Sequence, residues 1–245
     1  MHRFFIDNDN IKKGGIIITD ENVNHISRVL RLKERDKIIL CDGKGTDYIV
    51  SIDSMDKYAV RTTILYNEPS VGESNLDMVV YQGIPKSSKM DFIIQKCTEL
   101  GVNRIVPVIN TRTVVKLATE KEELMKVERW QRIAKEAAKQ SGRGKIPVID
   151  MPMTFENAIN EAVSKDLVLM PYELEKNNTL KEVIRGKNPN SVGIFIGPEG
   201  GFESDEVQFA LCKNVITVTL GNRILRTETA GLVILSCIMY EFNQI

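Results

Sequence analysis

The pattern of hydrophobic positions changes about a third of the way along the chain, and the change predicts two kinds of structure. From Gly15 to Glu68, short β-branched runs alternate with turn clusters such as Asp42-Gly43-Lys44-Gly45. This pattern is typical of a small β-barrel or sandwich. The predicted strands are 16–18, 37–40, 48–52 and 58–64, with one helix at 23–30.

A stretch rich in glycine, proline and polar residues follows, from Glu68 to Asn75, and has the composition of a linker. We therefore predict a domain boundary near residue 72, with domains at 1–72 and 73–245. After the boundary, strands alternate with longer helices, which predicts a parallel α/β sheet covered on both faces. The predicted strands are 76–82, 104–108, 146–149, 167–170, 192–196 and 215–220. The predicted helices are 90–100, 119–142, 179–186, one that begins near Ser204, and 229–242.

Charge adds a functional expectation. The chain has 33 basic and 33 acidic residues, a balance that argues against a nucleic-acid-binding protein. Residues 84–147, however, contain 14 basic and 7 acidic residues, whereas residues 148–245 contain 8 and 13. A basic central segment fits a face that binds a polyanion, and a solvated helix face rich in lysine explains it equally well.

Composition also argues against other classes of protein. The four cysteines are far apart and only two histidines are present, so neither a zinc site, another metal site nor a disulfide framework is expected. The longest apolar run, 230–240, is too short to span a membrane, and we expect a cytoplasmic protein.

The most specific local motif is Ile194-Phe195-Ile196-Gly197-Pro198-Glu199-Gly200-Gly201-Phe202, a buried strand that runs into a glycine-rich turn. Such a turn allows a ligand to approach the backbone, although a tight connection between strand and helix needs the same glycines. A second turn, Leu220 to Ala230, also follows a strand and precedes a helix. Two such loops on neighbouring strands would form one cleft, with Arg226 and Glu228 at its rim.

Two basic loops complete the candidates. Lys86 and Lys89 lie in Ile84-Pro85-Lys86-Ser87-Ser88-Lys89, ahead of a helix, where they could bind phosphates or be plain surface lysines. Arg143 lies between glycines at the end of the 119–142 helix. We expect it to be accessible to RNA. A cation that caps the carboxyl end of the helix explains its position equally well.

The motifs together resemble a known family. They are Met1-His2-Arg3-Phe4-Phe5, His25-Ile26-Ser27-Arg28-Val29-Leu30-Arg31, Lys96-x-Thr98-Glu99-Leu100-Gly101-Val102, Gln140-Ser141-Gly142-Arg143, the first glycine turn, and Leu220-Gly221-x-x-Ile224-Leu225-Arg226-x-Glu228-Thr229-Ala230. In this combination the chain resembles, over essentially its whole length, the 16S ribosomal RNA uracil-N3-methyltransferases of the RsmE type, which are members of the SPOUT class.

The resemblance implies more than the residues alone. It implies an amino-terminal PUA-like RNA-binding domain and a SPOUT methyltransferase domain with a carboxy-terminal trefoil knot. It implies S-adenosylmethionine as cofactor, held by the two glycine turns, and a homodimer that acts on 16S ribosomal RNA of the small subunit. The product would be a uridine methylated at N3.

Roles for individual residues follow from the resemblance together with the chemistry of the side chains. Arg226 would stabilise negative charge on the uracil, Glu228 would orient Arg226 or accept the N3 proton, and Arg143 is a further catalytic candidate that reaches across the dimer. The expected cofactor residues are Ile196, Gly197, Gly200, Leu220, Gly221, Ile224, Leu225 and Thr229. The expected RNA-binding residues are Arg3, Arg28, Arg31, Lys86, Lys89 and Arg143.

Two alternatives remain open at this stage. The same fold and cofactor could serve another nucleotide of ribosomal or transfer RNA, because a fold does not dictate its substrate. The protein could also be a non-catalytic RNA-binding factor in ribosome assembly, in which the glycine loops are structural turns.

Overall fold

The computed structural model describes residues 1–245 except residues 7, 13, 20, 116–118 and 245. The described chain divides into two compact units, residues 1–73 with 138–146, and residues 74–137 with 147–245. The chain therefore leaves the first unit after residue 73 and later returns to it for a short segment. The predicted single boundary near residue 72 leaves out this segment, residues 138–146, which packs with the first unit.

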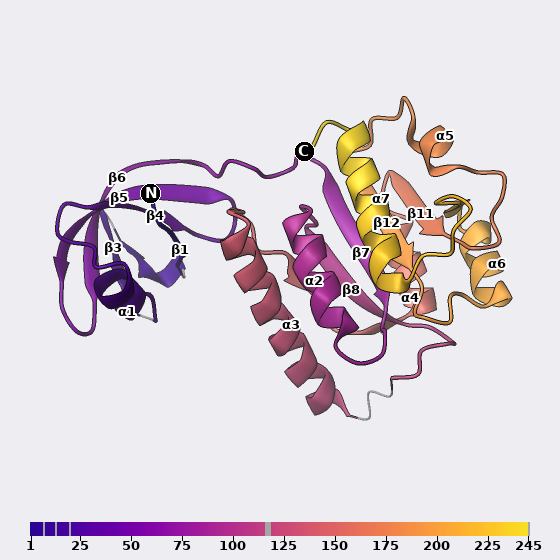
Figure 1. The fold of residues 1–245 in the computed structure, drawn as a ribbon, viewed down its shortest axis with the longest axis horizontal. Helices are drawn as coiled ribbons and strands as arrows, with labels where there is room; N and C mark the ends of the chain where they lie inside the picture. The colour runs from indigo at the N-terminus through magenta and orange to yellow at the C-terminus, as the bar shows by residue number, and fades with distance from the viewer. Residues whose placement is uncertain (7, 13, 20, 116–118, 245) are drawn as a thin grey trace. The chain divides into compact units, whose positions relative to one another are not determined.

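The first unit is built on a sheet that has six strands among the residues described. Its order is β1-β4-β5-β6-β3-β2, with β1 parallel to β4 and the other pairs antiparallel. Register shifts between β5 and β6 indicate bulges, which bend a sheet, and the sheet curves around α1 (Figure 1). The elements are β1 (Arg3–Phe5), η1 (Asn8–Asn10), β2 (Ile11–Lys12), β3 (Gly15–Ile18), α1 (Asn22–Asn24), η2 (His25–Val29), β4 (Lys37–Cys41), β5 (Thr46–Met55) and β6 (Val60–Pro69).

The core of the first unit lies between this sheet and the helical segment of α1 and η2. Ile16 and Ile18 of β3 and Ile38 and Leu40 of β4 are fully buried, at the two-residue spacing that places side chains on one face of a strand. Ile26 of η2 packs into the same cluster.

The predicted strands of this unit are confirmed with one correction. The structure has β3, β4, β5 and β6 where the sequence predicts strands. However, β6 begins at Val60 and continues to Pro69, so Glu68 and Pro69 belong to the strand and not to the linker. Pairing with β5 over this length explains the difference, because the ladder continues as far as Thr46 opposite Pro69.

The second unit contains a parallel sheet with seven strands in the described part of the chain. Its order is β10-β8-β7-β12-β11-β13, and β9 also pairs with β8. The strands are β7 (Asp77–Gly83), β8 (Arg104–Ile109), β9 (Val148–Ile149), β10 (Met153–Thr154), β11 (Leu167–Pro171), β12 (Ser191–Ile196) and β13 (Ile216–Val218).

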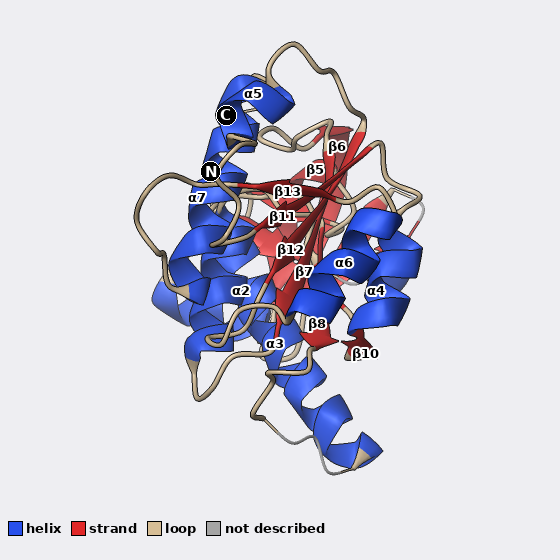
Figure 2. Ribbon diagram, turned by 90° about the vertical axis from the view of Figure 1, so that its right-hand side faces the viewer, coloured by secondary structure: helices blue, strands red, loops and turns tan. Residues whose placement is uncertain are grey.

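Helices cover both faces of this sheet, as the sequence predicts. Ile93 of α2, Trp130 of α3 and Ile234 of α7 pack into one core, and Phe155 of α4 and Val207 of α6 pack into the other. Figure 2 shows α2 and α7 on one side of the sheet and α4 and α6 on the other. The helices are α2 (Lys89–Glu99), α3 (Glu120–Gln140), α4 (Phe155–Ala162), α5 (Leu180–Ile184), α6 (Ser204–Cys212) and α7 (Thr227–Glu241).

Local capping chemistry explains where several helices begin. The hydroxyl of Thr119 accepts the backbone N–H of Glu122, and Thr179 and Glu182 repeat this contact at α5. Thr154 caps α4 in the same way, through the N–H of Asn157. Both α4 and β10 are short and are absent from the predicted elements, although Phe155, Ala158, Ile159 and Ala162 of α4 are buried at the spacing of an amphipathic helix.

Candidate functional site

A large cleft opens in the second unit at the carboxyl ends of β11, β12 and β13. Its volume is about 1260 Å³, and segments 171–173, 196–202 and 219–227 line it together with side chains of α5 and α7. The two glycine turns therefore share one cleft, as the sequence predicts. The expectation that their strands are neighbours is wrong, because β11 lies between β12 and β13.

The first glycine turn follows β12 directly and needs glycine for close packing. A Cβ atom on Gly197 would lie 3.1 Å from the Cα of Gly201 and 3.3 Å from the ring of Phe202. Gly201 has a φ of +69°, in the left-handed region that favours glycine. Glu203 and Glu206 then form a capping box at the start of α6. Backbone groups therefore make up much of this wall of the cleft.

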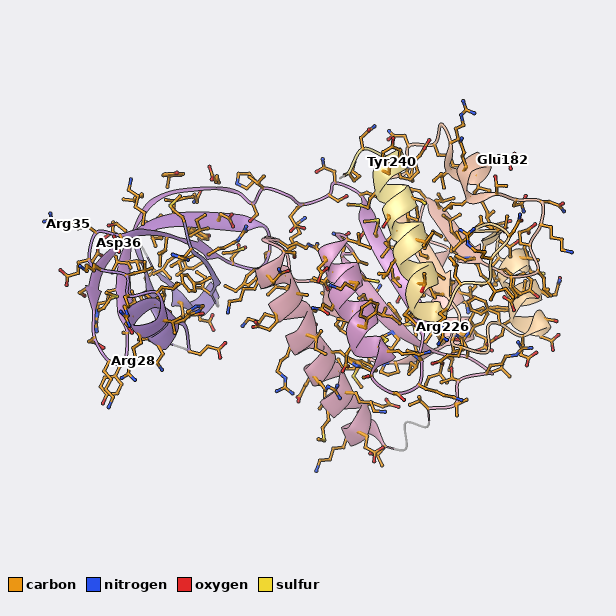
Figure 3. The ribbon with its side chains drawn as sticks, in the orientation of Figure 1. Arg28, Arg35, Asp36, Glu182, Arg226 and Tyr240 are labelled. Atoms are coloured by element: carbon orange, nitrogen blue, oxygen red, sulfur yellow. The ribbon has the colours of Figure 1, made fainter. Side chains whose placement is uncertain are left out.

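The second turn connects β13 to α7. Gly221 has a φ of +107°, and its N–H donates to the hydroxyl of Thr219 at 3.2 Å. Ile224 projects outward with 88% of its surface exposed. Arg226 is the N-cap residue of α7, and its exposed side chain lies at the start of that helix (Figure 3). The turn thus places a guanidinium group at the edge of the cleft.

A buried relay connects the two turns. The hydroxyl of Thr227 donates to the carbonyl of Gly197 at 2.6 Å and accepts a hydrogen bond from Nε2 of Gln82 at 2.9 Å. Gln82 is fully buried and Thr227 is 6% exposed. Because Thr227 follows Arg226 directly, the relay fixes the start of α7 against the first turn.

Replacing Thr227 with valine preserves the shape of the side chain but removes its hydroxyl group. We expect the free energy of unfolding of the second unit to fall by about 1–3 kcal/mol, since Nε2 of Gln82 and the carbonyl of Gly197 each lose a hydrogen bond to Thr227. Thr229→Val, at an exposed position of the same turn, is the matched control and should change it by less than ~0.5 kcal/mol. Denaturant unfolding followed by circular dichroism measures both, and equal losses in the two variants would contradict this role.

A cluster of charges lies beside the relay. The ammonium group of Lys89, the first residue of α2, is 3.0 Å from Oε1 of Glu199 and 3.5 Å from Oε2 of Glu228. Glu199 also accepts the backbone N–H of Lys86 at 3.1 Å. Burial raises the pKa of Glu199, but the hydrogen bonds from Lys89 and from backbone N–H groups keep that pKa below its ordinary value. The hydrogen bond to Glu199 raises the pKa of Lys89.

Arg112 holds the loop between the first glycine turn and α6 through hydrogen bonds. Its guanidinium donates to Oε1 of Glu203 at 2.7 Å and to the carbonyl of Gly200 at 2.5 Å. The hydrogen bond from Arg112 lowers the pKa of Glu203. These contacts add a second support for the first glycine turn.

The structure brings most of the expected cofactor residues together. Seven of them line the cleft, namely Ile196, Gly197, Gly200, Leu220, Gly221, Ile224 and Leu225. Thr229, in the first turn of α7, does not line it. Residues 171–173, Thr227 and Ala230 also line the cleft, and the sequence predicts no role for them. The predicted strand 167–170 could have indicated that residues 171–173 line the cleft. These residues follow its carboxyl end, at the edge of the sheet where the two glycine turns lie.

The expected RNA-binding residues divide into two groups. Arg28, Arg31 and Lys86 are exposed. Arg3 is not available on the surface, because its guanidinium pairs with Asp47 at 2.5 Å and donates to the carbonyl of Gly142 at 2.7 Å. Lys89 also forms ion pairs, with Glu199 and Glu228. The sequence could not reveal these partners, which lie far away along the chain.

Arg143 differs most from its expectation. The sequence predicts an accessible side chain, but Arg143 is 4% exposed and pairs with Glu73 at 2.9 Å. Glu73 also accepts the N–H groups of Gly144 and Lys145 at 2.8 Å and 3.0 Å. Burial raises the pKa of Glu73, yet the hydrogen bonds and charge of Arg143 hold that pKa below its ordinary value. Arg143 therefore anchors the returning segment within the first unit.

Comparison with known proteins agrees with this geometry. A family model described as an RNA methyltransferase domain matches residues 72–239, and an RNA methyltransferase PUA domain matches residues 18–65. The ribosomal RNA small subunit methyltransferase E of Bacillus subtilis is 35% identical over 98% of this chain and 97% of its own length. The chain belongs to the ribosomal RNA small subunit methyltransferase E family.

Solved structures of similar proteins extend the family likeness to the fold. A ribosomal RNA small subunit methyltransferase E from Neisseria gonorrhoeae bound to S-adenosyl methionine is 30% identical, covers 98% of this chain and 97% of its own, and has a TM-score of 0.84. A methyltransferase from Legionella pneumophila, in complex with the same cofactor, is 28% identical over 97% and 96% of the two chains, with a TM-score of 0.83.

Two further observations concern the described residues as a whole. They contain no group of three or more histidine, cysteine, aspartate or glutamate side chains that could hold a metal ion. No helix within the described ranges has the length and apolar character needed to cross a membrane.

Proposed function

We propose that this protein transfers a methyl group from S-adenosylmethionine to N3 of a specific uridine in 16S ribosomal RNA of the small subunit. The observation that carries the proposal is the cleft where both glycine turns meet and where Arg226 lies at the rim. Family membership over the full length supports the RNA substrate, and the cofactor-bound relatives support the methyl donor.

The residues of the cleft fit this cofactor. Gly197, Gly200 and Gly201 line the cleft and carry no side chain, so this wall offers backbone groups to a ligand. Glu173 and Glu199 line the same cleft, and their negative charge suits a sulfonium cation. When bound, the cofactor supplies an electrophilic methyl carbon. We assign its binding, chiefly through backbone groups, to Ile196, Gly197, Gly200, Leu220, Gly221, Ile224 and Leu225. Thr229 is left out of this assignment, because it does not line the cleft.

The proposed mechanism uses positioning and charge. N3 of uracil must lose its proton as the new N–C bond forms, and negative charge develops on the base. Arg226, whose guanidinium stays protonated, stabilises that charge at a uracil oxygen. Glu228, two residues further on, orients Arg226 or accepts the N3 proton. Alignment of N3 with the methyl carbon is the remaining contribution of the cleft.

We also propose the wider assembly that the family resemblance implies. Residues 1–72 form the RNA-binding PUA-like domain and residues 73–245 the catalytic domain, with Arg28, Arg31 and Lys86 as RNA contacts. Arg3, Lys89 and Arg143 could bind RNA only if their present ion pairs opened, which weakens them as candidates. The homodimer is supported by the exposure of apolar side chains beside the cleft, such as Ile224 and Tyr240. A trefoil knot and a cytoplasmic location remain predictions.

Gly197→Ala tests the cofactor assignment. The added Cβ would press against the backbone of Gly201, a clash of the kind that costs about 1–3 kcal/mol, so we expect affinity for S-adenosylmethionine to fall roughly tenfold or more. The matched control is Gly231→Ala in α7, where a Cβ would make an ordinary contact of 3.7 Å with Ile196. Calorimetric titration measures both, and unchanged affinity in Gly197→Ala would contradict the assignment.

The proposed function itself is tested by calorimetry and methyl transfer together. The purified protein should bind S-adenosylmethionine and transfer its labelled methyl group to small subunits from a strain that lacks this gene. Binding without transfer to any ribosomal or transfer RNA would contradict the activity. Absence of binding would favour a non-catalytic assembly factor.

A further inference from the structure

The acidic side chains that line the cleft differ in what they contact. Among the described residues they are Glu173, Glu175, Glu199 and Glu241. Oε2 of Glu175 accepts the hydroxyl of Thr217 at 2.6 Å, and its Oε1 accepts the N–H of Asn177 at 2.8 Å. Glu199 pairs with Lys89 at 3.0 Å. The carboxylates of the other two glutamates have no hydrogen bond or ion pair within the described chain.

Glu173 lies beside the first glycine turn. It follows the end of β11 by two residues, at the edge of the sheet where the cleft opens. A Cβ atom on Gly201 would lie 2.9 Å from Oε1 of Glu173 and 3.4 Å from its Oε2. The carboxylate therefore lies against the backbone of the turn to which the cofactor is assigned.

The cations around Glu173 do not neutralise it by direct pairing. None of the basic residues that line the cleft forms an ion pair with it in the part of the chain that the structure describes. Arg112 directs its guanidinium to the carboxylate of Glu203 and the carbonyl of Gly200. The hydrogen bond to Glu203 raises the pKa of Arg112, and the charge of Glu173 adds to this shift from a longer distance. Glu173 thus presents a negative charge to the cleft without a direct partner.

Methyl transfer changes the charge of the cofactor. N3 of uracil forms a bond to the methyl carbon and passes its proton to a base, while the C–S bond breaks and its electron pair stays on sulfur. The sulfonium cation of S-adenosylmethionine becomes the neutral thioether of S-adenosylhomocysteine. The adenosine, amino and carboxyl groups are the same in both compounds, so contacts with those groups alone cannot distinguish donor from product. A carboxylate close to the sulfur atom can distinguish them.

We propose that Glu173 is a specificity-determining residue that favours binding of the positively charged methyl donor over binding of its neutral product. This inference rests on the proposed function. The attraction between the carboxylate and the sulfonium group holds the donor in the cleft. It ends when the methyl group has left, so the product dissociates more readily and the next donor molecule replaces it.

The ratio of the affinities for S-adenosylmethionine and S-adenosylhomocysteine tests the proposal. In Glu173→Gln we expect the preference for the donor to fall roughly tenfold, which corresponds to about 1.4 kcal/mol. Affinity for the product should change little, because no charge on sulfur is lost. Glu173→Asp retains the charge and should retain most of the preference. Calorimetric titration of each protein with each compound measures these ratios without any turnover.

Glu241→Gln is the matched control. It removes the same charge from the same cleft, but Glu241 lies at the end of α7, fourteen residues beyond Thr227 and roughly 20 Å further along the helix axis. This separation exceeds the distance of about 8 Å over which salt screens charges at physiological ionic strength. The preference of this variant should therefore match that of the wild type.

Sinefungin provides an independent probe, because an ammonium group replaces the methylated sulfur in this compound. It carries the positive charge but cannot donate a methyl group. In Glu173→Gln its affinity should fall together with that of S-adenosylmethionine. Retention of sinefungin affinity in this variant would contradict the role of charge.

An equal loss of affinity for donor and product in Glu173→Gln, or an unchanged preference, would overturn the proposal. Either result in a wild-type protein that binds both compounds would leave the proposed function intact. If the wild type binds neither compound, the proposed function fails and this inference fails with it.

Discussion

We expect Arg226→Ala to reduce turnover by about 10²–10³-fold, the loss that follows removal of one donor to a developing negative charge. Affinity for S-adenosylmethionine should change little, because the cofactor is assigned to backbone groups of the turns. The side chain is exposed at the N-cap of α7, and it forms no ion pair with any described residue. It is therefore available to contact the uracil.

Arg223→Ala is the control for Arg226→Ala. Arg223 is an exposed arginine that lines the same cleft and precedes Arg226 in the same turn. If it contributes only to the general charge of the cleft, turnover should fall far less than in Arg226→Ala. Single-turnover kinetics with saturating cofactor makes the comparison. Wild-type turnover in Arg226→Ala, together with a large loss in Arg143→Ala, would contradict the assignment.

Arg143→Ala should act on stability first. Removing one partner of a buried ion pair leaves Glu73 charged and uncompensated, which costs about 3–5 kcal/mol. We expect faster hydrogen exchange in residues 138–146 and a lower unfolding midpoint. Arg61→Ala is the control, because its pair with Asp56 is exposed on both sides and should contribute little to stability. Equal stability of the two variants would show that Arg143 is not an anchor.

The contribution of this pair should also depend on pH. The folded pKa of Glu73 is lower than its ordinary value of 4.5, so the contribution is fully present above that value and is lost as the pH falls below it. The difference in stability between wild type and Arg143→Ala should therefore narrow in acid. A constant difference would mean that Arg143 stabilises the segment by packing and not by charge.

Much of the fold and of the cleft could be predicted from the sequence, because the evidence there is local. The alternation of strands and helices specifies a parallel sheet covered on both faces. Each glycine turn follows a buried strand, and Gly201 and Gly221 adopt the positive φ angles that glycine permits. Thr119 and Thr179 begin helices through capping contacts only three residues away.

The features that could not be predicted from the sequence depend on contacts between residues that are distant along the chain. Nothing near Arg143 indicates that Glu73 will bury it, and nothing near Arg3 indicates its pairing with Asp47. The order of strands places β11 between β12 and β13, although β11 comes first along the chain. For the same reason the sequence does not indicate that Lys89 pairs with Glu199, in the turn after β12, and with Glu228, in α7.

The most direct test of the central claim is mass-spectrometric mapping of nucleosides in 16S RNA. The RNA would come from small subunits of a strain that lacks this gene, before and after incubation with the purified protein and S-adenosylmethionine. We predict that a single N3-methyluridine appears at one position and that Arg226→Ala fails to produce it. A methyl group on another atom or another nucleotide, or none on either the subunit or its free RNA, would contradict the account.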